Sequence, residues 1–157
     1  MPTDARQTRR RGPFRHLIAR FVALWAGELR SVELYKDSLV AFATPSDIPR
    51  VAAAAAQIVR STQWSELSRA DFAERMSDVF AWTNYAHPFR EDNGRTAKVF
   101  LMHVAELSRY QLRFDLVEPD RWNLASMYTL PDRQSTTPVP ALMVPVFAEM
   151  SELRDRS

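Results

Sequence analysis

The chain has 157 residues, of which 46% are hydrophobic, and this is enough to bury the core of one domain. Its formal net charge is only +2 and it contains no cysteine, which excludes disulfide frameworks, thiolate chemistry and cysteine-ligated zinc. The longest apolar run, 51–56, is far shorter than the roughly 20 residues that cross a bilayer, and no signal peptide is visible. We therefore expect a cytoplasmic protein without a membrane span.

Positive charge is concentrated in the first thirteen residues, which include Arg6, Arg9, Arg10 and Arg11. Short charged termini are commonly disordered, so we expect 1–13 to form a flexible basic arm ahead of a single domain over 14–157. Contact with nucleic acid through this arm is the less favoured alternative.

Most of the chain carries apolar residues at intervals of three and four, the spacing of amphipathic helices. Helices are predicted over 14–29, 46–60, 68–85, 94–110, 119–128 and 140–154. The stretch 32–43 is different, because β-branched and apolar residues flank the polar turn Lys36-Asp37-Ser38, and this pattern predicts a small β-hairpin. The predicted fold class is therefore all-α with one β-hairpin.

Several of these helices have recognisable start signals. Ser46 can cap the helix that continues to residue 60, and Ser68 with Asp71 forms a capping-box-like start for the helix that continues to residue 85. Pro119 opens the next-to-last helix, and Pro145 must start or kink the last one.

The twelve residues 87–98, HPFREDNGRTAK, bring a base, a carboxylate, an amide and three cations into one short segment. A histidine titrates near neutrality and can accept a proton, and a carboxylate can hold a divalent cation. A glycine ahead of an amphipathic helix can offer backbone N–H groups to an anion, and Gly94 is one of only three glycines in the chain. The segment therefore predicts a phosphate-handling loop.

This run resembles the signature of the Fic family, H-x-F-x-[D/E]-G-N-[G/K]-R-x-x-R. It departs from that signature at Asp92, where the family has glycine, and at Lys98, where the family has arginine. Two further stretches are similar to family segments: 25–30, WAGELR, to the approach to a flap hairpin, and 122–126, WNLAS, to a later core helix. The resemblance implies a mainly helical Fic fold over 14–157, with the motif loop at 87–98 and the flap at about 32–43.

The resemblance also implies a role for each residue of the loop. His87 would be the general base that takes the proton from an attacking hydroxyl, and Glu91 would hold a Mg²⁺ that bridges two phosphates of ATP. Asn93 and the backbone around Gly94 would form an anion hole, while Arg95 would clamp the triphosphate. The full set of nucleotide-contacting residues would be Lys36, Asp37, Arg90, Asp92, Asn93, Gly94, Arg95, Thr96 and Lys98.

The two departures from the signature affect the nucleotide site directly. Asp92 could repel phosphate, or its Cβ could exclude the backbone angle that glycine adopts; alternatively, aspartate tolerates the left-handed conformation and its side chain points to solvent. Lys98 keeps the positive charge that would meet the γ-phosphate but loses the two-pronged geometry of arginine. Phe89, which the motif also specifies, is expected to anchor the loop in the core.

The implied activity is that of a protein adenylyltransferase, which moves AMP from ATP to a Ser, Thr or Tyr hydroxyl of a target protein. Relatives that transfer another phosphate-containing group share the loop, so the transferred group is the first alternative. A catalytically impaired Fic domain that acts as a binding module is the second. A nucleic-acid-binding helical protein that uses the basic arm is the third.

The resemblance also implies partners. The family holds its target in extended form against the flap by main-chain pairing, so 32–43 is the docking candidate. Many members are restrained by a helix reading [S/T]-x-x-x-E-[G/N], and the nearest stretch here, 62–66, fails at Leu67. We therefore expect control by a separate small helical, antitoxin-like inhibitor, or no such control.

Overall fold

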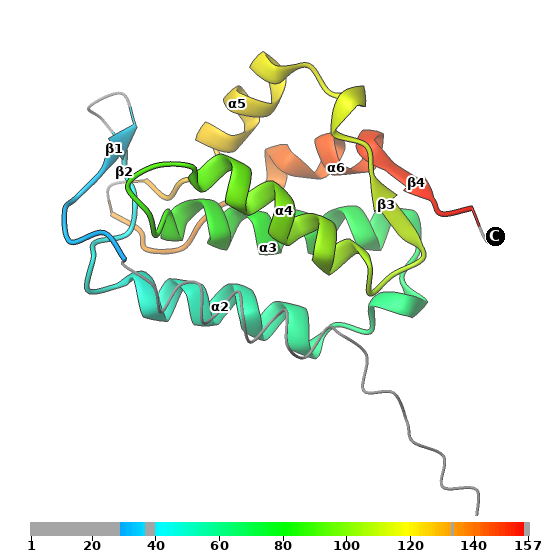
Figure 1. Cartoon of the computed structure of the whole chain (residues 1–157), viewed down its shortest axis with the longest axis horizontal. Coiled ribbons are helices and arrows are strands. Elements are labelled where there is room, and N and C mark those ends of the chain that lie inside the picture. The colour runs from blue at the N-terminus through cyan, green and yellow to red at the C-terminus, as the bar shows by residue number, and fades with distance from the viewer. Residues whose placement is uncertain (1–28, 37–39, 133, 156–157) are drawn as a thin grey trace, which may run out of the picture.

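The structure, a computed structural model, describes residues 29–36, 40–132 and 134–155 (Figure 1). The expected basic arm, nearly all of the helix expected at 14–29, and Asp37 lie outside these residues. The described part is mostly helical, with two short antiparallel strand pairs. This confirms the mainly helical fold with a small β-hairpin.

The helix α3 (Arg69–Ala86) is the central element of the described part. The helices α2 (Ile48–Ser61), α4 (Asn93–Ala105) and α6 (Val144–Met150) pack against it, and α5 (Pro119–Met127) lies beyond α4 (Figure 1). Short 3-10 turns occur at Trp64–Glu66, Phe114–Leu116 and Ala141–Met143. No helix in the described ranges is both long and apolar enough to cross a membrane.

The start of α3 follows the sequence prediction. Ser68 is the N-cap: its hydroxyl oxygen accepts a hydrogen bond from the backbone N–H of Asp71 at 3.1 Å and donates to the Asp71 carboxylate at 2.6 Å. This reciprocal pair satisfies one of the helix's unpaired donors and fixes where the helix begins.

The start of α2 does not follow the prediction. The N-cap is Asp47 rather than Ser46, and it gives no side-chain cap because its carboxylate is held by Arg50 at 2.6 and 2.7 Å. The Ser46 hydroxyl lies 3.1 Å from that of Thr44 instead. Pro49 stands in the first turn, where its missing N–H costs nothing.

Two strands replace the ends of predicted helices. The helix expected at 94–110 ends at Ala105, and Tyr110–Leu112 forms β3, which pairs antiparallel with β4 (Ser151–Leu153). The helix expected at 140–154 is correspondingly reduced to α6, which Pro145 starts. The pairing of β3 with β4 joins segments about forty residues apart, and the local spacing of apolar residues cannot predict such a contact.

The predicted hairpin is present at the flap position. Strands β1 (Tyr35–Lys36) and β2 (Val40–Ala41) pair antiparallel, with Tyr35 opposite Ala41 and Lys36 opposite Val40. We call the whole stretch 32–43 the flap.

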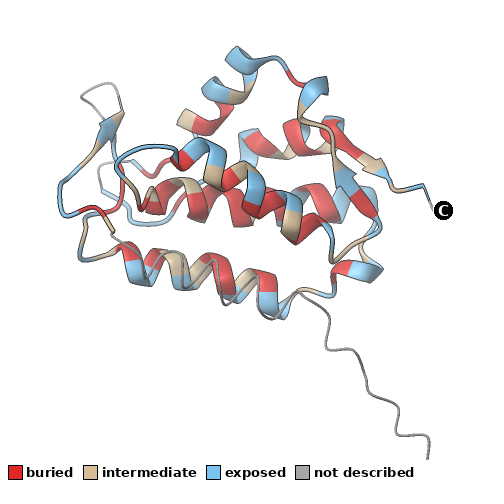
Figure 2. Ribbon diagram, viewed as in Figure 1, coloured by how far each residue is buried: buried red, intermediate tan, exposed pale blue. Residues whose placement is uncertain are grey.

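Two hydrophobic clusters hold the fold together (Figure 2). The larger joins α3, α4 and α6, and its aromatic members are Trp64, Phe72, Phe80, Phe100, Tyr110 and Phe147. The smaller joins the flap, α2 and the end of α3 through Phe42, Ala43, Ile48, Val51, Tyr85, Ala86 and Leu130. Phe89 packs against the smaller cluster, as expected for the residue that anchors the loop.

Substitution of Phe147 tests how much the larger cluster contributes to stability. It is fully buried, and its ring centroid lies 6.0 Å from that of Phe80 and 5.9 Å from that of Trp122. Phe147→Ala should lower the free energy of unfolding by about 3–5 kcal/mol, because it leaves a cavity. Leu142→Ala, at a residue 53% exposed, should change it by no more than about 0.5 kcal/mol. Urea titration of both variants checks this, and equal losses would place Phe147 outside the core.

Candidate active site

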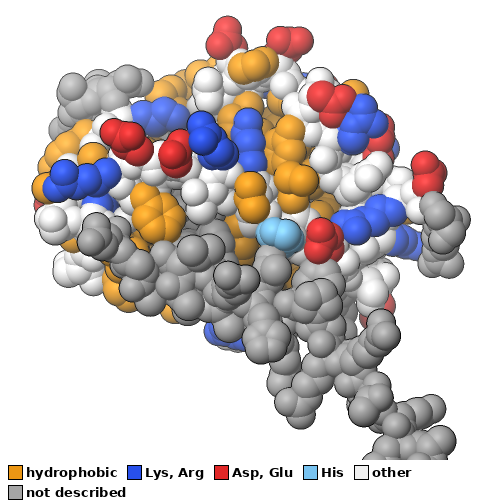
Figure 3. Space-filling view, viewed as in Figure 1, with side chains coloured by type: hydrophobic (Ala, Val, Ile, Leu, Met, Phe, Trp, Pro, Cys, Tyr) orange, Lys and Arg blue, Asp and Glu red, His pale blue; other side chains and the backbone are white. Residues whose placement is uncertain are grey.

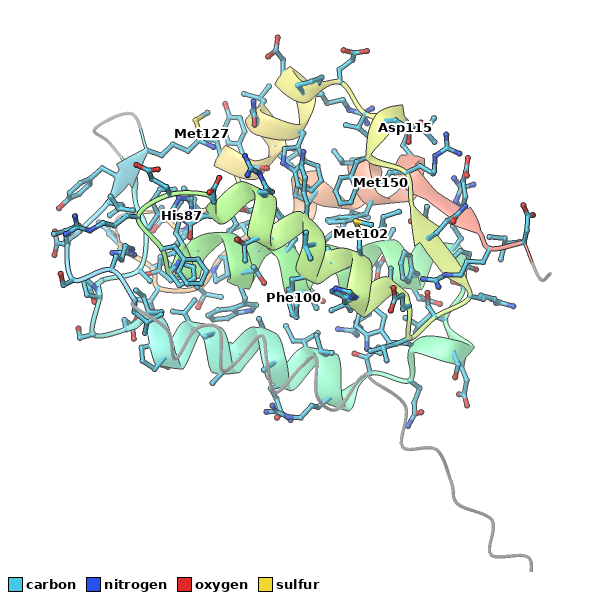
Figure 4. The ribbon with its side chains drawn as sticks, viewed as in Figure 1. His87, Phe100, Met102, Asp115, Met127 and Met150 are labelled. Atoms are coloured by element: carbon cyan, nitrogen blue, oxygen red, sulfur yellow. The ribbon has the colours of Figure 1, made fainter. Side chains whose placement is uncertain are left out.

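A pocket of about 130 Å³ lies where the end of α3, the following loop, the start of α4 and one face of α5 meet, with β1 at its edge. Figure 4 places His87 at this flap-side end of the helices. The lining residues are Lys36, Phe80, Thr83, Asn84, His87, Pro88, Phe89, Asn93, Gly94, Thr96, Ala97, Trp122, Asn123 and Ser126. The structure therefore brings together five of the predicted site residues: Lys36, His87, Asn93, Gly94 and Thr96.

The remaining predicted residues that the structure describes are not among those lining the pocket. Arg90, Glu91, Asp92 and Arg95 are exposed on the loop and the first turn of α4. Figure 3 shows basic and acidic side chains gathered on this part of the surface. A charged ligand could therefore extend from the pocket over these groups.

His87 follows the last residue of α3 and has a left-handed backbone, with φ 38° and ψ 58°. Its N–H still donates to the carbonyl of Thr83 at 3.3 Å. The imidazole stacks on the ring of Phe42 from the flap, with centroids 3.6 Å apart and an interplanar angle of 18°. The backbone of His87 is thus held by α3, and its ring is held by the flap.

The environment of His87 keeps its ring neutral. Burial, followed by the positive charge of Arg30, lowers the pKa of His87 from its ordinary 6.5 to about 4. Lys36 acts in the same direction, whereas a hydrogen bond with the main chain of Asn84 opposes the shift. At neutral pH the imidazole is therefore unprotonated and can accept a proton.

The loop is closed by the side chain of Asn93. Its Nδ2 donates to the carbonyl of Phe89 at 2.6 Å, and its Oδ1 accepts from the N–H of Phe89 at 2.9 Å. Because both ends of the amide are used in this way, Asn93 shapes the loop. The second N–H of Nδ2 and the main chain at the start of α4 are then the groups that could bind an anion.

The N-terminus of α4 carries no side-chain cap. Asp92 is its N-cap, and the first helical bond runs from Thr96 N–H to the Asp92 carbonyl at 2.9 Å. The N–H groups of the first turn therefore have no intrahelical acceptor, and with the helix dipole they form a site suited to a phosphate. Apart from the backbone of its own helix, a Cβ on Gly94 would meet no atom of the described residues within 4 Å, so the space beside it is open to a ligand.

Asp92 is the second left-handed residue of the motif loop after His87, with φ 61° and ψ 14°. Aspartate tolerates this conformation better than most residues, and the side chain is 64% exposed, 3.4 Å from the guanidinium of Arg95. Asp92 therefore accommodates the backbone angle, and its carboxylate faces solvent.

Glu91 is the metal candidate. Its carboxylate is exposed, and the described residues contain no group of three or more His, Asp or Glu that could cage an ion. A lone carboxylate fits Mg²⁺, which proteins commonly bind through one or two carboxylates together with substrate phosphates.

The Lys98 side chain is not among the pocket-lining groups, but it lies over two aromatic rings, of which that of Trp122 lines the pocket. Its ammonium lies 5.4 Å from the ring centroid of Phe114 and 5.3 Å from that of Trp122, within the range of cation–π attraction. The contact of Lys98 with the γ-phosphate stays a prediction.

Several pocket residues were not predicted as site residues. Thr83 and Asn84 precede His87 by about one helical turn, so helical periodicity alone could have placed them beside it. Trp122, Asn123 and Ser126 share one face of α5, and only the tertiary fold brings that face to the loop.

The chain is similar in sequence to proteins named protein adenylyltransferases. The chain is 33% identical over 104 residues to protein adenylyltransferase VbhT of Bartonella schoenbuchensis, covering 66% of this chain and 22% of VbhT. It is 30% identical over 103 residues to the Escherichia coli K12 protein named probable protein adenylyltransferase Fic, covering 65% and 51%. The chain thus spans about a fifth and about half of these relatives.

Solved structures share the fold. The N-terminal Fic domain of a VirB-translocated Bep effector from Bartonella quintana, solved with ADP, superposes with a TM-score of 0.68 at 25% identity, covering 84% of this chain and 66% of that chain. BepC of Bartonella tribocorum has a TM-score of 0.67 at 20% identity, covering 84% and 68%, a likeness of fold alone. The family model described as Fic/DOC family matches residues 14–105, more than half of the sequence. With its motif loop, flap and helical core in place, this chain belongs to the Fic/DOC family.

Proposed function

We propose that this chain is a protein adenylyltransferase that moves AMP from ATP to a Ser, Thr or Tyr hydroxyl of a target protein. The observation that carries the proposal is the placement of His87: a neutral imidazole lines a pocket that also contains the uncapped start of α4. A proton acceptor and a phosphate-binding helix end in one pocket suit phosphoryl-group chemistry. The names of the adenylyltransferase relatives support AMP as the transferred group.

The nucleotide would bind across the pocket and the exposed loop. At about 130 Å³ the pocket is smaller than the roughly 300–1,000 Å³ usual for whole ligands, so it would enclose only part of ATP. The phosphates would lie at the open N–H groups of α4, within reach of Arg90 and Arg95. Lys36, at the edge of the pocket, would add positive charge from the flap.

The chemical step would be an in-line displacement at the α-phosphorus. The target hydroxyl oxygen forms a bond to that phosphorus, the bond from it to the bridging oxygen of the β-phosphate breaks, and pyrophosphate leaves with the electron pair. His87 takes the hydroxyl proton. The negative charge of the bound triphosphate would raise the pKa of the imidazole and favour its protonated form as the reaction proceeds.

Mg²⁺ would be held by Glu91 and by phosphate oxygens, and it would neutralise charge on the departing pyrophosphate. The target segment would pair with the exposed edge of the flap, close to His87, because Phe42 of the flap stacks on that ring. A small helical inhibitor supplied in trans would act by placing an acidic side chain near Lys98.

The base is tested by His87→Ala. Transfer of AMP to protein should fall by about 10²- to 10⁴-fold, because the proton acceptor is lost, while ATP affinity should change little. Labelled ATP and a cell lysate provide the assay, and His103→Ala, on the far part of α4, is the matched control. Undiminished labelling by His87→Ala contradicts the mechanism.

Glu91→Gln tests the metal. The variant should need about tenfold or more Mg²⁺ for half-maximal transfer, because an amide is a weaker ligand than a carboxylate for a hard cation. Glu106→Gln, exposed beyond the other end of α4, should retain the wild-type Mg²⁺ dependence. An unchanged requirement in Glu91→Gln would mean that the metal is held elsewhere.

Variants of Asp92 distinguish an active enzyme from a catalytically impaired binding module. Because its backbone angle is already accommodated, Asp92→Gly should raise ATP affinity only modestly, by less than about tenfold, through loss of a nearby negative charge. Asp92→Asn, which removes the charge but keeps the Cβ, should reproduce that gain. An inactive wild type that Asp92→Gly activates would instead support the binding-module alternative.

A further inference from the structure

Arg30 occupies an unusual position for an arginine. It is 3% exposed, and its guanidinium donates hydrogen bonds to four main-chain carbonyls. Burial lowers its pKa, but a guanidinium stays charged in proteins. Burial of a charge is costly unless its donors are satisfied, and these four carbonyls supply the acceptors.

The acceptors of Arg30 come from two parts of the chain. Nη1 donates to the Val32 carbonyl at 2.8 Å, and Nη2 donates to the Ala43 carbonyl, so both ends of the flap are bound. Nε donates to the His87 carbonyl at 2.8 Å, and Nη2 also reaches the Ala86 carbonyl at 3.4 Å. One guanidinium therefore joins the flap to the end of α3.

Two main-chain hydrogen bonds run beside this guanidinium. The N–H of Arg30 donates to the Pro88 carbonyl, and the N–H of Ala43 donates to the Tyr85 carbonyl, both at 2.9 Å. Arg30, two residues before the flap, and Ala43, its last residue, thus bracket the turn that contains His87. This turn is also where the backbone is left-handed, a conformation that a residue other than glycine keeps only when its surroundings hold it.

We infer that Arg30 is the positioning residue of His87: its guanidinium fixes the left-handed turn and ties both ends of the flap to it, so that the imidazole and the target-docking strand keep one relative geometry. Arginine suits this task because its planar fork offers five donors in fixed directions, which three rotatable ammonium donors cannot reproduce. Its effect on the rate of transfer rests on the proposed function.

Arg30 also acts on the ring through its charge. Among the described residues it and Lys36 are the cations that lower the pKa of His87, after burial. The geometric and the electrostatic contributions can be separated, because lysine keeps the charge without the fork and methionine keeps neither.

The test compares Arg30→Lys, Arg30→Met and Arg69→Met. Arg69 is the matched control because it also donates to a distant carbonyl, that of Ala148, but from the opposite end of α3. The measurements are kcat and KM for AMP transfer, the titration of the His87 ring by NMR, and the exchange rate of the Arg30 Nε–H in the wild type. None of the NMR measurements depends on activity.

Arg30→Lys should lower kcat by about 10- to 100-fold with little change in KM for ATP, since misplacement of a reacting group costs rate rather than binding. Its His87 should still titrate near pH 4, whereas in Arg30→Met the pKa of His87 should rise above that value but stay below 6.5, because burial, the larger cause, remains. Arg69→Met should match the wild type in both respects. In the wild type, the Arg30 Nε–H should exchange more slowly than that of exposed arginines.

A folded Arg30→Met with wild-type kcat and wild-type titration of His87 overturns the inference. So does rapid exchange of the Arg30 Nε–H in the wild type, which needs no variant to fold. If the NMR results are as expected but the wild type transfers no AMP, the proposed function fails while the positioning role of Arg30 stands.

Discussion

The arrangement of the site depends on the turn by which the chain leaves α3. His87 takes a left-handed conformation at this point. Three contacts hold the turn: the hydrogen bond from the His87 N–H to the Thr83 carbonyl, the stacking of the imidazole on Phe42 of the flap, and the hydrogen bond from the buried guanidinium of Arg30 to the His87 carbonyl. The turn sends the chain into the loop that Asn93 closes and that then starts α4. The proton acceptor and the open helix end lie together because this turn is fixed.

The charges around the turn are matched to an anionic ligand. Burial and the nearby cations disfavour protonation of His87, and the start of α4 presents N–H groups that the side chain of its N-cap, Asp92, does not bind. Before a ligand binds, the site offers these open N–H groups and a neutral base. A triphosphate would accept hydrogen bonds from the N–H groups, and its negative charge would raise the pKa of His87 and so make the imidazole a stronger base. Binding and proton transfer are therefore favoured by the same arrangement.

The sequence predicted the motif loop, the flap and most helices because each has a local signature: Ser68 and Asp71 at a helix start, a polar turn between apolar strands, a contiguous run of site residues. It did not predict β3 and β4, because their pairing joins residues 110–112 to 151–153. Nor did it predict that the guanidinium of Arg30 binds carbonyls of distant residues such as His87. The cation–π contacts of Lys98 with Phe114 and Trp122 were not predicted either. Side-chain partners set by tertiary packing leave no periodic trace.

In the proposed reaction the bond broken in ATP joins the α-phosphorus to the oxygen that bridges to the β-phosphate, and His87 is the proton acceptor. The most direct measurement incubates the protein and a lysate with ATP labelled in parallel on the α- or the γ-phosphate, followed by mass spectrometry of the labelled bands. The account predicts label from the α-phosphate alone and a mass increase of one AMP on a hydroxyl residue. Label from the γ-phosphate, or an added group other than AMP, would contradict it.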